Sequence, residues 1–302
     1  MNWVHTLCRY ARLKLNNALC RVLFSGKQPP KKHFLSVCAI FKNEGRFLRE
    51  WLNYYLLAGV DHFYLYDDFS SNDNYKEVLK PYLDKGVVTL IEWRDSASFG
   101  QMPAYFDCVE KHSAESNWIA FFDLDEFAVP VGTMNLKTVL QRYNKFPSVS
   151  FYWKMFGSNG IVKDDPEKNV TEQFTLCWNF NSYKSVLNTK FSGLISKKSR
   201  SPHFFRFHFF NRVCPKNPAY YAGLRKKQIR PDVQLNHYYS KSYDYFCNKK
   251  MIGRNLDAKE KFSLRQFFDN EHRAVDADYQ IFRYMIELKT FDLDAWAEGR
   301  DA

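Results

Sequence analysis

From residue 33 onward, short apolar segments alternate with amphipathic segments in the first half of the chain. The apolar segments lie at 34–41, 62–66, 87–93 and 118–123, and the amphipathic ones at 46–57, 74–83 and 101–113. Apolar runs of this length are typical of strands buried on both faces, and helices that join such strands form right-handed βαβ units. The pattern therefore predicts an α/β fold with a mostly parallel central sheet flanked by helices.

The second half of the chain alternates less regularly. Its pattern predicts a helix at 136–143, a strand at 148–156, an exposed loop at 161–173, a last strand at 233–238, and helices at 241–251 and 275–289. Short strands are expected near 174–178, 184–187, 190–195 and 203–209. We therefore divide the chain into a basic N-terminal segment (1–32), a main domain (33–255) and a C-terminal helical segment packed on that domain (256–302).

Residues 3–24 have the spacing of an amphipathic basic helix. The segment lacks the ~20 apolar residues of a spanning helix, and Arg9, Arg12 and Lys14 interrupt the apolar centre that a secretory signal requires. Two interpretations stay open, which are packing against the chain's own domain and docking on an anionic membrane surface. With no signal and no spanning helix, we expect a cytoplasmic protein that binds peripherally to the inner face of the membrane.

The formal net charge of +11 is unevenly distributed. Residues 1–32 contain seven Lys/Arg, residues 173–231 contain twelve, and neither segment has an acidic residue. Such blocks favour anionic partners, for example nucleotides, phosphorylated sugars or a membrane. We find no nucleic-acid-binding motif, so nucleic acid is not the expected partner. The seven cysteines contain no Cys-x-x-Cys pair, and reduced cytosolic thiols are the simplest account of them.

The apolar segment at 118–123 ends in Asp123, Asp125 and Glu126. Ligands of open α/β sheets bind beyond the carboxyl ends of the strands. Carboxylates placed there can hold Mg²⁺ or Mn²⁺, which also binds substrate phosphates. The alternative is an acidic turn that caps a core strand.

Several further motifs occur in one order along the chain. They are 39–44 (AIFKNE), 50–51 (EW), 59–63 (GVDHF), 66–73 (YDDFSSND), 123–127 (DLDEF), 153–160 (WKMFGSNG) and 235–242 (LNHYYSKS). In this order they resemble glycosyltransferase family 92 and related family-2-like enzymes over about residues 34–255. The resemblance implies a GT-A fold, a nucleotide-sugar donor such as a UDP-sugar, and Mn²⁺ or Mg²⁺ held by the Asp-x-Asp motif.

The resemblance also suggests roles for single residues. Asp123 and Asp125 are the expected metal ligands, and His237 completes the shell, unless it is a histidine of the aromatic core. The donor nucleotide is expected at Asn43, Glu44, Asp68, Gln101, Asp123 and Lys184. As alternatives, Asp68 is a capping turn residue and Glu44 interacts with the helix dipole.

An inverting transfer also needs a carboxylate that takes the proton of the acceptor hydroxyl. Candidates are Glu172, Asp164, Asp165 and Glu126. We favour Glu172, which follows the glycine-containing loop at 157–160 and adjoins the second basic block; the alternative is a solvated loop acid.

Together these features predict a metal-dependent glycosyltransferase, of bacterial origin, that acts on a glycan or lipid-linked glycan acceptor such as an envelope polysaccharide or lipopolysaccharide. Two other classes stay open. One is a nucleotidyltransferase with a related α/β core, and the other is a nucleic-acid-binding protein that uses the basic blocks.

Overall fold

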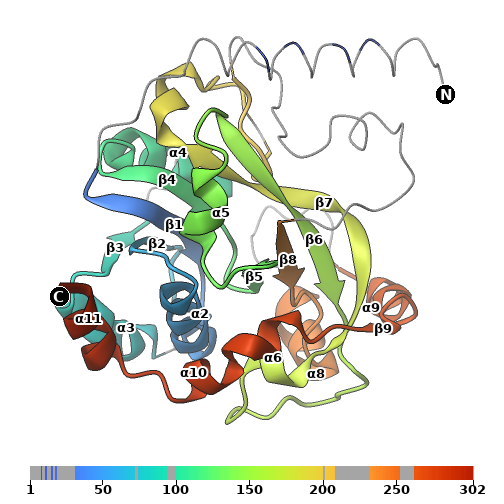
Figure 1. The fold of residues 1–302 in the computed structure, drawn as a ribbon. Coiled ribbons are helices and arrows are strands. Elements are labelled where there is room, and N and C mark those ends of the chain that lie inside the picture. The colour runs from blue at the N-terminus through green and yellow to red at the C-terminus, as the bar shows by residue number, and fades with distance from the viewer. Residues whose placement is uncertain are drawn as a thin grey trace.

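The computed structural model contains one sheet with strand order β3-β2-β1-β4-β7-β6-β8-β5, and β9 pairs with β7 (Figure 1). It describes residues 31–71, 74–93, 100–199, 201–207, 232–251 and 262–301, and the single positions 8, 11, 15 and 18. The strands are β1 (His33–Phe41), β2 (His62–Asp67), β3 (Val88–Glu92), β4 (Ser116–Phe121), β5 (Glu126–Pro130), β6 (Ser148–Phe156), β7 (Leu176–Asn188), β8 (Val233–His237) and β9 (Asp276–Ala277). The α/β fold class is confirmed.

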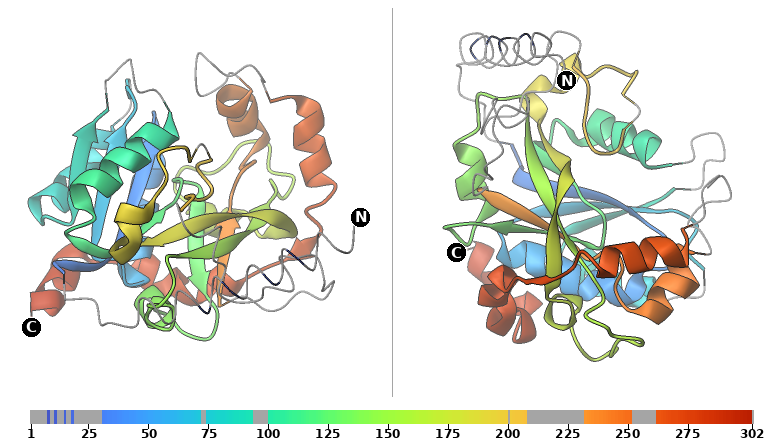
Figure 2. Two further views of the ribbon diagram at one scale, coloured as in Figure 1. Left: turned by 90° about the horizontal axis from the view of Figure 1, so that it is seen from above. Right: turned by 90° about the vertical axis from the view of Figure 1, so that its right-hand side faces the viewer.

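The first half of the sheet is parallel. Strand β1 pairs in parallel with β2 and β4, and β2 pairs in parallel with β3. Helices α2 (Gly45–Leu57) and α3 (Tyr75–Asp84) cover one face, and α4 (Gln101–His112) covers the other (Figures 1 and 2). All these elements match the predicted βαβ alternation.

The second half of the sheet is mixed rather than mostly parallel. Strand β7 runs antiparallel to β4 and β6, while β8 runs parallel to β6 and antiparallel to β5. Strand β5 was not predicted, because it begins with the carboxylate of Glu126 and is short. Residues 176–178 and 184–187 of the expected short strands are parts of the single strand β7, while 174–175 precede it.

Other local predictions were wrong in kind. Residues 190–194 lie in a 3-10 helix rather than a strand, and Ile195 forms a single bridge with Phe207. Residues 203–206 are not in a strand, and 208–209 of the expected strand near 203–209 lie outside the described residues. The predicted helix at 241–251 consists of one α-turn followed by a π-turn. The remaining helical elements are α5 (Leu136–Gln141), α6 (Val170–Gln173), η1 (Thr189–Leu194), α8 (Tyr243–Tyr245), η2 (Phe246–Lys250), α9 (Leu264–Glu271), η3 (Gln280–Tyr284), α10 (Met285–Lys289) and α11 (Leu293–Asp301).

Most of the two predicted basic blocks lies outside the described residues, including 208–231. Positions 8, 11, 15 and 18 are helical, and the rest of the expected N-terminal helix is likewise outside them. In the part of the chain that the structure describes, no helix has the length and apolarity needed to cross a membrane.

Aromatic side chains of α2 fix the loop that follows β4. Trp51 Nε1 donates to the carbonyl oxygens of Asp123 and Glu126, at 3.1 Å each. Tyr55 Oη donates to the Glu126 carbonyl at 3.0 Å and accepts from the Ala128 amide at 3.0 Å. These side chains are fully buried, so the acidic loop has a rigid support on one side of the sheet.

Two stacked histidines lie at the amino ends of β1 and β2, at the end of these strands away from the acidic loop. The rings of His33 and His62 are 4.5 Å apart, and both side chains are buried. Burial, followed by the charge of His33, lowers the pKa of His62 to about 3. His62 is therefore neutral in the folded protein over the physiological pH range.

This pair predicts a loss of stability in acid. The folded-state pKa of His62 lies below its unfolded value of about 6.5, so its contribution is complete above pH 6.5 and declines as the pH falls toward 3. Each such histidine adds a slope of up to about 1.4 kcal/mol per pH unit. Urea denaturation between pH 7 and 4 should show a shallower pH dependence in His62→Gln than in the exposed control His272→Gln. Equal slopes in the two variants would contradict this assignment.

Candidate functional site

The predicted acidic motif runs from the loop after β4 to Glu126, the first residue of β5, at the carboxyl end of the parallel half of the sheet. The amide of Glu126 donates to the Asp123 carbonyl at 3.0 Å, and the Asp123 amide donates to Glu126 Oε2 at 3.0 Å. The motif thus forms a closed turn, and hydrogen bonds from Trp51 and Tyr55 of α2 support it. This geometry gives the three carboxylates different directions and different partners.

Asp125 is the centre of a buried positive cluster. Its Oδ2 atom lies 3.0 Å from Lys250 Nζ and 3.7 Å from Lys241 Nζ. Its Oδ1 atom lies 3.3 Å from His237 Nε2. Burial acts to raise the pKa of Asp125, but Lys250, His237 and Lys241 outweigh it and hold that pKa well below its usual range. Asp125 is therefore an anion at neutral pH.

Pairing between β5 and β8 brings His237 to this position. Glu126 is opposite His237 in the antiparallel register, and the Tyr238 amide donates to the Asp125 carbonyl at 2.8 Å. Burial lowers the pKa of His237 more than Asp125 raises it, so the imidazole is neutral at physiological pH. A neutral imidazole is the form that binds a metal ion.

Asp123 points to a different set of partners. Its Oδ2 atom accepts a hydrogen bond from Lys184 Nζ at 2.9 Å, and its Oδ1 atom accepts one from Gln101 Nε2 at 2.7 Å. Lys184 Nζ also lies 3.8 Å from Glu126 Oε2. The structure therefore brings together four of the predicted residues, Gln101, Asp123, Glu126 and Lys184, beside the pair of Asp125 and His237.

Glu126 and Lys184 are almost completely buried. Burial, together with Asp123 and Asp125, raises the pKa of Glu126 well above its usual range, although Lys184 acts against this. Burial lowers the pKa of Lys184, but the surrounding carboxylates, Asp123 first, more than reverse this and raise it. Lys184 is thus the fixed positive charge of the acidic turn, and the raised pKa of Glu126 reflects its burial beside two other carboxylates.

The donor atoms of Asp125 and His237 fit a divalent cation. Two ligands about 2.1 Å from one ion in an octahedral shell lie about 3 Å apart, close to the 3.3 Å between these atoms. No described residue donates a well-aligned hydrogen bond to Asp125 Oδ1. Among the described side chains, no three His, Cys, Asp or Glu converge as a metal cluster, because Asp123 faces Gln101 and Lys184. A cation at this position would therefore have two protein ligands, Asp125 and His237, and would take its other ligands from phosphate or water.

The predicted nucleotide residues Asn43, Glu44 and Asp68 follow the neighbouring strands β1 and β2. Asn43 has a left-handed backbone with φ 50°; its amide donates to Ser70 Oγ, and its Oδ1 accepts from the Ser71 amide. Asp68 is half-buried directly after β2. Glu44 is buried at the start of α2, and its side chain makes no capping hydrogen bond. The two loops are thus joined at the same edge of the sheet as the acidic turn.

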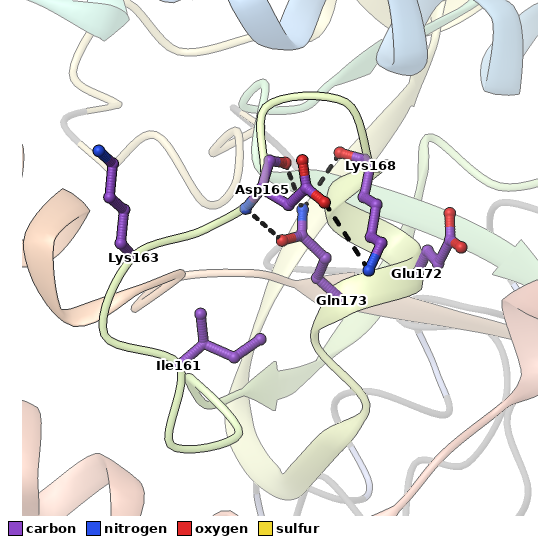
Figure 3. A pocket seen from close by; sticks show the side chains of 6 residues that line it. All are labelled: Ile161, Lys163, Asp165, Lys168, Glu172 and Gln173. Carbon is purple, nitrogen blue, oxygen red and sulfur yellow. Dashed lines mark hydrogen bonds and ion pairs between the residues drawn. The ribbon is translucent and has the colours of Figure 1, made fainter.

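The remaining candidate carboxylates have partners outside the acidic turn. Ile161, Lys163, Asp165, Lys168, Glu172 and Gln173 line a pocket of about 490 Å³ (Figure 3). Glu172 forms an ion pair with Lys289 at 2.7 Å, and the Asp165 amide and carbonyl bond to the Gln173 side chain. Asp164 pairs with Arg46 at 2.5 Å and accepts from Ser242 Oγ. The structure therefore does not join the candidate bases Glu172, Asp164 and Asp165 to the metal-ligand pair.

Two important lysines were not predicted. Lys241 belongs to the motif at 235–242, has a left-handed backbone with φ 49°, and lies between the rings of Phe47 and Tyr245, at 4.7 and 4.4 Å. Lys250 ends the π-turn η2. The motif itself was a usable signal for Lys241, since a lysine beside a predicted metal-binding histidine suits an anionic ligand. Nothing in the local sequence distinguishes Lys250 from Lys249.

The chain matches the family model "Glycosyltransferase family 92" over residues 31–283. It is 30% identical over 148 residues to a glycosyltransferase family 92 protein of Oryza sativa, covering 48% of this chain and 25% of that protein. It is 33% identical over 109 residues to a galactan beta-1,4-galactosyltransferase of Arabidopsis thaliana, covering 33% and 22%. It is 30% identical over 108 residues to a beta-1,4-galactosyltransferase of Caenorhabditis elegans, covering 32% and 25%. The chain thus spans about a quarter of the length of these curated relatives.

Solved structures give weaker similarities. A mannosyltransferase from Pyrobaculum calidifontis in complex with GDP-Man and Mn²⁺ is 11% identical, with a TM-score of 0.42 and coverage of 97% of this chain and 81% of that one. S. aureus TarS in complex with UDP is 16% identical, with a TM-score of 0.36 and coverage of 52% and 47%. The family match over most of the chain agrees with the motif order noted in the sequence: the chain belongs to glycosyltransferase family 92.

Proposed function

We propose that the protein is a metal-dependent glycosyltransferase that moves a sugar, with galactose the first candidate, from a UDP-sugar to a hydroxyl of a glycan acceptor. The family membership and the galactosyltransferase names of the Arabidopsis and nematode relatives support the reaction class. The central observation is the pair of Asp125 Oδ1 and His237 Nε2, which lie 3.3 Å apart beyond the parallel half of the sheet. A carboxylate and a neutral imidazole together favour Mn²⁺ over Mg²⁺.

Asp125 and His237 would hold the cation, which when bound offsets the charge that develops on the leaving nucleoside diphosphate. Lys250 and Lys241 add positive charge on the same side of the acidic turn. Gln101 and Lys184 orient Asp123. We propose that Asp123 accepts hydrogen bonds from the donor. Asn43, Glu44 and Asp68 belong to the neighbouring loops, where we place the nucleoside.

A screen of nucleotide sugars tests this proposal. UDP-galactose with Mn²⁺ is expected to raise the melting temperature more than either component alone, and incubation with galactan or other β-linked glycan acceptors should release UDP. Release of pyrophosphate from a nucleoside triphosphate and sugar phosphate would identify a nucleotidyltransferase instead. Salt-sensitive binding of DNA or RNA without any metal requirement would favour a nucleic-acid-binding protein.

The catalytic base is tested by separating the carboxylate of Glu172 from its ion pair. With Glu172 as the base, Glu172→Gln is expected to lower the transfer rate by about 10²–10⁴-fold with little change in donor affinity. Lys289→Gln is the matched control, since it breaks the same 2.7 Å ion pair and keeps the carboxylate. Similar, near-normal rates in both variants would reduce Glu172 to a surface ion-pair residue and direct attention to Asp164 and Asp165.

The source of the protein and its place in the cell concern the acceptor that it meets. The relatives named above come from plants and a nematode, so they offer no support for a bacterial source or an envelope glycan.

Membrane docking by the basic N-terminal segment remains our proposal, with exposed Leu15 on its expected apolar face. Deleting residues 1–27 is expected to abolish sedimentation with anionic vesicles and spare transfer to a soluble acceptor. Unchanged sedimentation, or no binding by the intact chain, would exclude this role.

A further inference from the structure

Lys250 lies unusually close to Asp125, the carboxylate that we propose as a metal ligand. Its Nζ atom lies 3.0 Å from Asp125 Oδ2, on the same carboxylate whose Oδ1 faces His237. The same Nζ atom also lies over the ring of Tyr239, 4.6 Å from the ring centroid. Asp125 therefore already has a close counter-ion at one of its two oxygens.

The two lysines next to Asp125 differ in their freedom to move. Lys241 is 1% exposed and is enclosed by the rings of Phe47 and Tyr245. Lys250 has a side chain that is 18% exposed and lies at the end of the five-residue π-turn η2. π-turns are rare and occur frequently at functional sites. Lys250 is thus the partner of Asp125 that can exchange its contact for another.

The same turn also reaches the loop after β1. Lys249 Nζ donates to the carbonyl oxygens of Lys42 and Asn43, at 2.9 and 2.7 Å. Lys249 therefore anchors the turn beside the predicted nucleoside loop, while the next residue extends to the acidic turn. A diphosphate that spans these two loops would pass within reach of Lys250.

A divalent cation on Asp125 and His237 would meet the ammonium of Lys250 on the same carboxylate. Like charges this close repel, and the repulsion is strong where water is scarce. Diphosphate oxygens are good acceptors for a lysine ammonium. We propose that Lys250 competes with the metal for Asp125 and transfers to the nucleotide diphosphate, which makes metal binding and nucleotide binding depend on each other. This inference rests on the proposed function and adds a coupling residue to it.

Competition of this kind predicts the direction in which metal affinity changes when Lys250 is substituted. Removing the charge of Lys250 should strengthen binding of the metal alone, whereas removing a positive charge that only binds the diphosphate would leave it unchanged. Coupling between two ligands is reciprocal, so the effect of nucleotide on metal affinity should fall by the same factor as the effect of metal on nucleotide affinity. Typical couplings are about 5–150-fold.

The experiment measures Mn²⁺ binding to the full chain from the electron paramagnetic resonance signal of free Mn²⁺, without and with UDP. UDP binds Mn²⁺ in solution, so that complex is measured separately. Without UDP, Lys250→Gln is expected to bind Mn²⁺ about tenfold more tightly than the natural chain, and UDP should improve its affinity less. Lys250→Arg keeps the charge and should resemble the natural chain. Lys154→Gln, which breaks an ion pair with Asp278 elsewhere, is the control for charge removal.

Unchanged or weaker Mn²⁺ binding by Lys250→Gln without UDP would overturn the inference, as would equal tightening in Lys154→Gln. If Lys250→Gln does not fold, Lys250→Met is measured in the same way, and equal Mn²⁺ affinity of the natural chain with and without UDP would itself overturn the coupling. These results leave the proposed function intact. Failure of the natural chain to bind either Mn²⁺ or UDP would instead contradict the proposed function.

Discussion

Asp125→Asn is expected to abolish sugar transfer while the protein stays folded. The substitution keeps the shape of the side chain but removes the charge that faces His237, Lys241 and Lys250. Loss of one electrostatic contact to a developing charge typically lowers kcat by about 10²–10³-fold, and loss of the metal's anionic ligand should exceed this. The rate of UDP release with Mn²⁺ and the circular dichroism spectrum check the two parts of the prediction.

Asp278→Asn is the matched control, because Asp278 is also buried and also forms a lysine ion pair, with Lys154. It should affect stability but leave the transfer rate within a few-fold of normal. Substantial activity of Asp125→Asn in the presence of EDTA would show that neither Asp125 nor a bound metal is needed. Equal losses in both variants would point to a general effect of burying an unpaired lysine.

The first half of the fold was predictable because each element has a pattern that its environment requires. Strands β2 and β4 are buried along their whole length and β1 at every position except Phe34, and their sequences are correspondingly apolar. Helix α2 has one apolar face and polar residues on the other, so its limits followed within one residue. In contrast, β7 includes an irregularity opposite 152–154 that exposes 179–181, which made one long strand resemble two short ones.

The site was predictable where it depends on strand order or on a motif, as for His237, and not where it depends on other contacts between distant segments. Asp123 and Asp125 follow an apolar strand, and Gln101 begins the helix before it, so the sequence alone places them at one edge of the sheet. The contact of Lys184 with Asp123 spans 61 residues, and that of Lys250 with Asp125 spans 125. No local pattern encodes such pairs. Glu172 is a different case. Its position after a motif suggested that it is the catalytic base, but in the structure its partner is Lys289.

Lys184→Met is expected to be among the most destabilising single substitutions in the chain. Lys184 is 1% exposed, and it is the ammonium that Asp123 and Glu126 share. Removing one partner of a buried ion pair typically costs about 3–5 kcal/mol, because the other charge stays buried without compensation. The raised pKa of Lys184 also indicates that its charge stabilises the folded protein. A group whose folded-state pKa lies above its unfolded value contributes its full stability at neutral pH.

Urea denaturation at pH 7 should therefore show a large decrease in the free energy of unfolding for Lys184→Met. The control Lys80→Met removes an exposed lysine that pairs with Asp84 on α3, and such pairs contribute about 0.3–0.5 kcal/mol. Adding Asp123→Asn to Lys184→Met should restore part of the loss, because it removes the carboxylate that Lys184→Met leaves without its counter-ion. If the two losses simply add, Lys184 stabilises the protein by packing of its aliphatic chain, and the charge balance at the acidic turn must come from Lys241 and Lys250.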